Sequence, residues 1–102
     1  MRSNLFMLNK IVLDLETQKE FAEVGGRGRP HLLKVALVGV YSYATDKYEI
    51  YEERQMHKLG ELLASADQLI GYNIRQFDLE VLRPHLNFSI EQIPVLDLLE
   101  EV

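Results

Sequence analysis

The amino-terminal half of the chain shows the hydrophobic pattern of β-strands. Residues 8–15, 31–43 and 47–53 are rich in aliphatic, β-branched and aromatic side chains. The four residues "ATDK" separate the second run from the third, and such a short polar connection is typical of a hairpin turn. We therefore expect three strands, of which the second and third pair antiparallel.

The rest of the chain alternates between helical and strand patterns. Residues 54–66 and 76–86 carry apolar side chains at the spacing of one helix face, and Pro84 predicts that the second helix ends or kinks near that point. Residues 68–73 form a short apolar strand between these helices. Residues 93–102 predict a last strand that turns into a helix.

This order of elements predicts an α/β fold. We expect a mixed sheet of five strands, with an antiparallel hairpin at one edge, parallel strands at the other and flanking helices. The first strand is the most apolar and should lie at the centre. The length of 102 residues allows one modest core, so we interpret residues 1–102 as a single domain.

Composition narrows the class of protein. Hydrophobic residues make up 47% of the chain and charged residues 26%, as in ordinary globular proteins, and no apolar stretch approaches the roughly 18 residues of a membrane span. We expect a cytoplasmic protein without a membrane partner. The absence of cysteine excludes disulfides and Cys-based zinc sites. The net charge of −5 argues against a broad grip on nucleic acid through Lys and Arg, although bound metal ions can reverse the local sign.

Two carboxylates interrupt the first strand. In "KIVLDLET" (10–17), Asp14 and Glu16 are two positions apart, so both side chains project from the same face near the end of the strand. In open α/β sheets this end is where ligand crevices form. Two ionised acids about 6 Å apart repel by roughly 3 kcal/mol at an effective dielectric near 20, and a shared proton, a cationic side chain or a bound metal relieves such repulsion. The alternative is an exposed strand end without a function.

A third acid follows the next strand of the parallel part. "GYNIRQFD" (71–78) places Asn73 and Asp78 at a strand-to-helix junction, which opens onto the same crevice if this strand lies parallel beside the first. The alternative is that Asp78 only stabilises the start of the following helix. Carboxylates without Cys or His are the ligands that Mg²⁺ and Mn²⁺ prefer, and two such ions can clamp a phosphodiester.

The two motifs together resemble a known family. "VLDLET", followed about sixty residues later by "IGYNIRQFDLEVL", resembles the first two motifs of the DEDD family of 3′–5′ exonucleases, the proofreading type. That family has a ribonuclease-H-like fold, which agrees with the strand order expected here. The resemblance implies hydrolysis of terminal phosphodiesters at a single-stranded DNA or RNA 3′ end, with one Mg²⁺ or Mn²⁺ ion activating a water and a second stabilising the leaving 3′-oxygen. It assigns metal-binding and catalytic roles to Asp14, Glu16 and Asp78, and substrate contacts to Thr17, Asn73 and Phe77.

The family's third motif is expected beyond Val102. It consists of a Tyr or His followed four or five residues later by the fourth acid, so we expect this chain to be the amino-terminal part of an exonuclease domain. Asp97 is interpreted as a helix cap. His85 is interpreted as a partly exposed polar residue and not as the residue that orients the water.

Two other readings stay open. The chain can be a non-catalytic ribonuclease-H-like module that binds nucleic acid or a partner protein. It can also form a homo-oligomer through a sheet face that later helices would otherwise cover.

Two further groups of residues have competing interpretations. Arg27 and Arg29, in the glycine-rich segment "GGRGRP" (25–30), either contact substrate phosphates or lie in a solvated loop. Four tyrosines fall on the hairpin strands, where cross-strand packing is a simpler interpretation than base stacking. They are Tyr41, Tyr43, Tyr48 and Tyr51.

Overall fold

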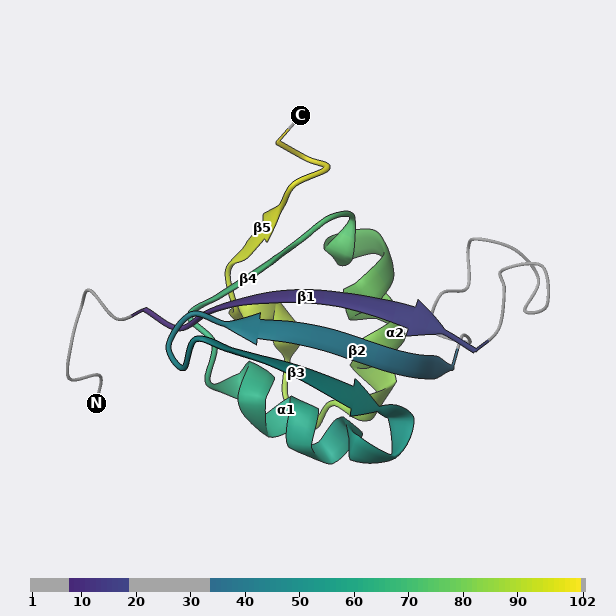
Figure 1. The fold of residues 1–102 in the computed structure, drawn as a ribbon. Coiled ribbons are helices and arrows are strands. Elements are labelled where there is room, and N and C mark those ends of the chain that lie inside the picture. Colours follow the sequence, from purple (N-terminus) through teal and green to yellow (C-terminus); the bar gives the residue numbers. More distant parts are fainter. Residues whose placement is uncertain (1–7, 19–33, 102) are drawn as a thin grey trace.

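The computed structural model describes residues 8–18 and 34–101, which form a mixed five-stranded sheet with helices packed against it (Figure 1). The strand order is β3-β2-β1-β4-β5. The strands are β1 (Lys10–Thr17), β2 (Val35–Ser42), β3 (Lys47–Glu52), β4 (Gln68–Gly71) and β5 (Val95–Asp97). This architecture is consistent with a ribonuclease-H-like fold.

β1 lies at the centre of the sheet and joins its antiparallel and parallel parts. It pairs antiparallel with β2 and parallel with β4. β2 and β3 form the antiparallel hairpin, and β5 pairs parallel with β4. The predicted mixed sheet, with the first strand at its centre, is confirmed.

Two composite helical segments account for the two predicted helices. The first consists of a 3₁₀ turn (Glu53–Gln55) that leads into α1 (Met56–Ala64). The second consists of a π-helical turn (Ile74–Asp78), α2 (Leu79–Leu82) and a 3₁₀ turn (Arg83–His85). α2 ends where predicted because Pro84 has no N–H with which to continue the α-helical hydrogen bonds.

The chain after β5 differs from the expectation. Instead of the predicted helix, residues 98–101 form a turn. The Leu98 N–H donates to the Gly71 carbonyl with an N–O distance of 2.8 Å. This bond continues the parallel β4–β5 pairing by one residue, and the turn begins directly after it.

Strand alternation places one apolar face of the sheet in the core. Ile11, Leu13 and Leu15 of β1 are buried, while Asp14 and Glu16, which alternate with them, are exposed. The buried face packs against α1 and α2 through a single cluster of apolar side chains. This cluster includes Val38, Val40, Leu59, Leu63, Leu69, Ile74, Val81 and Leu82.

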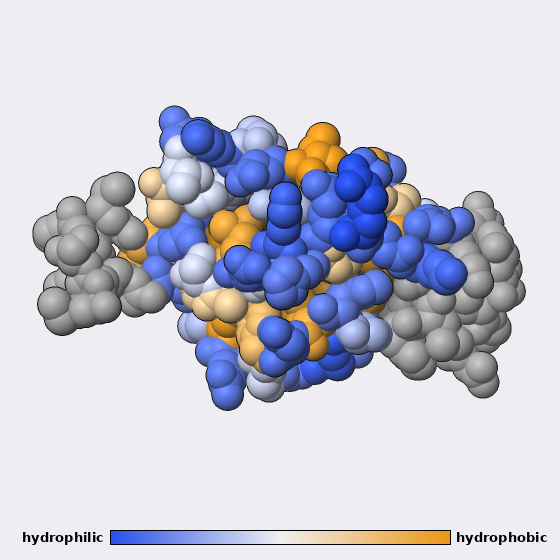
Figure 2. Space-filling view, turned by 90° about the horizontal axis from the view of Figure 1, so that it is seen from below, coloured by the Kyte–Doolittle hydropathy of each residue, from blue (hydrophilic) through white to orange (hydrophobic). Residues whose placement is uncertain are grey.

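The side of the molecule on which α1 lies is largely polar. Seen from below, the side on which α1 lies in Figure 1, most of the surface is hydrophilic, with separate hydrophobic patches between the polar side chains (Figure 2). Neither α1 nor any other helix within 8–18 and 34–101 is long and apolar enough to cross a membrane.

Candidate functional site

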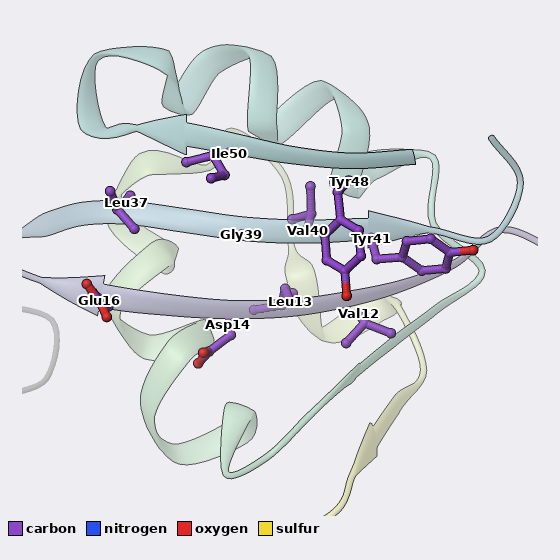
Figure 3. Close-up of a pocket in the computed structure, with 10 residues that line it drawn as sticks. All are labelled: Val12, Leu13, Asp14, Glu16, Leu37, Gly39, Val40, Tyr41, Tyr48 and Ile50. Carbon is purple, nitrogen blue, oxygen red and sulfur yellow. The ribbon is translucent and has the colours of Figure 1, made fainter. Parts of the chain in front are cut away.

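Asp14 and Glu16 lie on the sheet face opposite the helices. Both are exposed and alternate along β1 with the buried Leu13 and Leu15. Figure 3 views this face and shows the two carboxylates projecting from the same side of β1. The prediction that the two acids share a face is confirmed.

β1 and β4 separate near these acids. Their parallel pairing ends at Val12 and Ile70. Gly71 follows at the end of β4, where an added Cβ would lie 2.8 Å from the Leu13 carbonyl oxygen and 2.3 Å from Ile74 Cγ2. Only glycine allows the main chain at position 71 to come this close to β1. The chain leaves the sheet after Gly71, and the turn that follows still contacts β1.

Asn73 turns the chain toward the carboxylates of β1. Its φ of 57° and ψ of 32° lie in the left-handed region, which Asn adopts more readily than most residues. The π-helical turn Ile74–Asp78 begins immediately afterwards and ends in Asp78. This turn brings Asp78 back to β1, although the two are far apart in the sequence.

The carboxylate of Asp78 is buried against the central strand. Its Oδ2 accepts a hydrogen bond from the Leu15 N–H at an N–O distance of 3.2 Å, and the residue is only 2% exposed. Burial, followed by the negative charge of Asp14, raises the pKa of Asp78 to about 7, despite the opposing effect of backbone hydrogen bonds. Asp14 and Asp78 are therefore close enough for their charges to interact.

Asp97 supports the turn that carries Asp78. One oxygen of its carboxylate accepts hydrogen bonds from the Asn73 and Leu99 N–H groups at 2.7 and 3.1 Å, and the other accepts from the Arg75 N–H at 3.0 Å. Burial acts to raise the pKa of Asp97, but these backbone bonds and the charge of Arg75 lower it overall. Asp97 was expected to cap a helix following its own strand. Residues 98–101 form no helix, and the carboxylate of Asp97 accepts bonds both from the turn after β4 and from Leu99 in the turn after β5.

The other predicted site residues occupy different surroundings. Thr17 is the last residue of β1, beyond a register shift between Glu16 and Thr17. Phe77 is partly buried and packs against the core. His85 is half-buried in the 3₁₀ turn after α2. The segment 25–30 with its two arginines lies outside the described residues.

A hollow of about 350 Å³ adjoins Asp14 and Glu16 on the same face (Figure 3). Gly39 of β2 lies opposite Asp14 on one side and Ile50 on the other. Because Gly39 has no side chain, the hollow extends between Asp14 and Ile50. The hollow is otherwise lined mainly by apolar and aromatic residues, among them Val12, Leu37, Tyr41 and Tyr48.

The predicted cross-strand packing of the hairpin tyrosines is confirmed for Tyr41 and Tyr48. Tyr41 and Tyr48 are directly paired on β2 and β3, with ring centroids 5.1 Å apart. Tyr43 meets Tyr41 edge-to-face at 5.4 Å. Tyr51 is buried on the opposite face. The hydroxyl of Tyr41 also hydrogen-bonds to the Asp46 carboxylate in the hairpin turn.

The donor chemistry of this site suits a hard cation, but the coordination set is incomplete. Asp14, Glu16 and Asp78 offer only carboxylate oxygens. A cation at Asp14 and Asp78 would relieve their mutual repulsion, which after burial is the second cause of the raised pKa of Asp78. Within residues 8–18 and 34–101, no three Asp, Glu, His or Cys side chains are gathered closely enough to hold a metal ion. The structure thus brings two of the predicted acids into electrostatic contact and leaves Glu16 exposed on the strand beside them.

Sequence reasoning missed two parts of the site. The hollow depends on Gly39, whose place opposite Asp14 requires the exact strand register. The supporting role of Asp97 had a detectable signal, since "VLDLL" places a carboxylate inside an apolar strand just as "VLDLE" does at Asp14. Nothing in the sequence indicated that Asp97 binds the main chain of Asn73 and Arg75.

Comparison with known proteins links this chain to others through its fold alone. The sequence matches no protein-family model and no curated protein. Among solved structures, it is similar to the family B DNA polymerase from the hyperthermophilic archaeon Pyrobaculum calidifontis, with a TM-score of 0.62 and 17% sequence identity. The match covers 90% of this chain and 15% of the polymerase chain. At this identity the similarity shows a shared fold, and the chain corresponds to a small part of the polymerase.

Proposed function

We propose that the chain carries residues of a metal-dependent 3′–5′ exonuclease site of the DEDD type. The observation that carries the proposal is the return of Asp78 to the central strand. Asp78 belongs to the second sequence motif, yet its carboxylate meets Leu15, the residue between the two acids of the first motif. A buried carboxylate beside another carboxylate is costly unless a proton or a cation accompanies it.

The structural neighbour supports the same class of function. Proofreading exonucleases act together with DNA polymerases, and the fold shared with a family B DNA polymerase is therefore in keeping with the resemblance of the two motifs. The substrate proposed here is the 3′ end of single-stranded DNA or RNA.

The residues divide into distinct roles in this proposal. Asp14, Glu16 and Asp78 would hold Mg²⁺ or Mn²⁺. When bound, such ions polarise the phosphate and lower the pKa of a coordinated water. Asp78 would have to be ionised to hold such an ion, and with a pKa of about 7 it is about half ionised at neutral pH without metal. Thr17 ends β1, and Asn73 and Phe77 belong to the turn after β4. We propose that these three residues contact the terminal nucleotide.

A titration with metal alone tests the site. Mn²⁺ should raise the thermal stability of the wild-type chain, by about 2.7 kcal/mol at a free concentration one hundredfold above Kd. Asp14→Asn and Asp78→Asn should each reduce the Mn²⁺-dependent shift. Glu49→Gln is the matched control, because it removes an exposed strand carboxylate from the edge strand β3. An equal shift in all four proteins would refute the metal site.

Hydrolysis is tested separately with labelled single strands. Time courses with DNA and RNA oligonucleotides, each with a free or a blocked 3′ end, distinguish exonuclease action from cleavage elsewhere. The proposal expects products shortened from the 3′ end, and their loss in Asp14→Asn.

The incomplete acid set favours a second candidate function. Because the described residues gather no group of three metal-ligating side chains, the chain can instead act as a ribonuclease-H-like binding module without catalysis. That candidate predicts binding of single strands in the presence of a chelator and no cleavage with either metal. Binding measured with and without EDTA distinguishes the two functions.

A further inference from the structure

The turn that carries Asp78 is held at its start by a residue from another strand. Asp97, the last residue of β5, is 3% exposed and accepts hydrogen bonds from the N–H groups of Asn73 and Arg75. These groups belong to the beginning of the segment that ends in Asp78. Asp97 therefore contacts one end of the turn while Asp78 occupies the other.

The turn is short and continuously hydrogen-bonded between these two ends. The Phe77 N–H donates to the Asn73 carbonyl at 3.2 Å. The Leu79 N–H donates to the Ile74 carbonyl. Because of these bonds, a shift of the main chain at Asn73 should also move Asp78.

Arg75 adds a second attachment between the turn and the chain around β5. Its Nη2 donates to the Val95 carbonyl at 3.2 Å, and its Nε lies 3.1 Å from Glu100 Oε1. These contacts are partly exposed, whereas the Asp97 carboxylate is buried. The buried contact is the one that fixes the position of the turn.

We propose that Asp97 is a positioning residue for Asp78. It holds the Asn73–Arg75 main chain in the place from which the Asp78 carboxylate meets the Leu15 N–H beside Asp14. A carboxylate is required because its two oxygens together accept three N–H bonds, and an amide can offer only one oxygen. An effect of Asp97 on metal binding rests on the proposed function, whereas its effect on the position of the Asp78 carboxylate does not.

Amide hydrogen exchange of Leu15, measured by NMR on the full 102-residue chain without metal, tests the positional effect. In Asp97→Ala we expect Leu15 to exchange at least about tenfold faster relative to the amides of β2, because the hydrogen bond to Asp78 is lost. Asp97→Asn should show a smaller increase of the same kind. A uniform loss of stability would instead accelerate Leu15 and the β2 amides by the same factor.

Asp67→Ala provides the matched control. Asp67 also accepts a main-chain bond, from the Asn9 N–H at 2.7 Å, but it precedes β4 at the other end of that strand. This variant should leave the ratio of Leu15 to β2 exchange unchanged. An unchanged ratio in Asp97→Ala, or in Asp97→Asn if the alanine variant does not fold, overturns the proposal. An equal change of this ratio in Asp67→Ala also overturns the proposal.

Mn²⁺ affinity separates this inference from the proposed function. If wild-type protein binds Mn²⁺, Asp97→Ala should weaken that binding by at least about tenfold. Equal affinities in the two proteins would overturn the role of Asp97 in metal binding. If the wild type binds no Mn²⁺, the proposed function fails, and the Leu15 measurement still decides whether Asp97 positions Asp78.

Discussion

The side chain of Asp78 lies against the main chain of Leu15, with 3.2 Å between Oδ2 and the nitrogen and 63 positions between the residues in the sequence. The contact occurs where β1 has lost its parallel partner, beyond the last paired residues Val12 and Ile70. A carboxylate takes the place that a β4 carbonyl would occupy if the pairing continued. The end of the parallel ladder thus determines where the acid enters the sheet.

The raised pKa of Asp78 makes stability depend on pH. The folded chain holds this proton with a pKa of about 7, against 3.8 for an ordinary Asp, so the protonated form stabilises the fold. This contribution is complete below about pH 4 and is lost as the pH rises through 7. We expect the contribution of Asp78 to the free energy of unfolding without metal to fall by up to about 4 kcal/mol across that window.

Asp78→Asn isolates this contribution, because the amide is neutral at every pH. We expect urea unfolding of the wild type and Asp78→Asn between pH 4 and 8 to give a difference in the free energy of unfolding that changes by up to about 4 kcal/mol. A constant difference between them would show that Asp78 titrates normally.

Bound metal should show the opposite dependence on pH. A cation binds the ionised carboxylate, so it competes with the proton on Asp78. We expect the Mn²⁺-induced rise in melting temperature to be larger at pH 8 than at pH 5.5. Thermal scans at both pH values measure this, and an equal rise would indicate a site that does not involve Asp78.

The two glycines next to β1 should respond differently to alanine. A Cβ at Gly71 meets the rigid Leu13 carbonyl oxygen at 2.8 Å, whereas a Cβ at Gly39 comes no closer than 3.9 Å to the Asp14 carbonyl oxygen. Gly71→Ala should cost about 1–3 kcal/mol, because either the turn or β1 must shift. Gly39→Ala should be close to neutral. Equilibrium unfolding of the pair checks this, and similar values for both would contradict the close approach at Gly71.

The left-handed backbone of Asn73 predicts a further contrast. Asn73→Gly should leave stability nearly unchanged, because glycine adopts a φ of 57° without strain and keeps the N–H that donates to Asp97. Asn73→Ala should cost about 1–2 kcal/mol, because its Cβ disfavours this region. Melting temperatures of the two variants provide the measurement. A glycine variant as unstable as the alanine variant would point to a role for the Asn side chain.

Much of the fold was accessible from local sequence patterns. The alternation around Asp14, the apolar run of β1 and the turn at Asp46 predicted the central strand, the face of the acids and the hairpin. These features depend on residues adjacent in the chain. The order of helices and strands then constrained the sheet, because a strand that follows a helix pairs parallel with an earlier one.

The details of the site were less accessible because they depend on register and on distant partners. Nothing near Asp97 in the sequence indicates that its carboxylate binds the main chain at Asn73. The depth of Asp78 likewise follows from the close approach at Gly71 and not from the residues around Asp78. The helix expected after β5 is replaced by a turn, in which the Glu100 N–H donates to the Asp97 carbonyl.

The separation of β1 from β4 after Val12 also bears on the kinetics of folding. Asp78 and Leu15 are 63 positions apart in the sequence, so we expect the repulsion between the carboxylates to arise after the more local strand pairs have formed. A cation that relieves this repulsion should therefore prolong the lifetime of the native chain against unfolding while leaving its refolding rate unaltered.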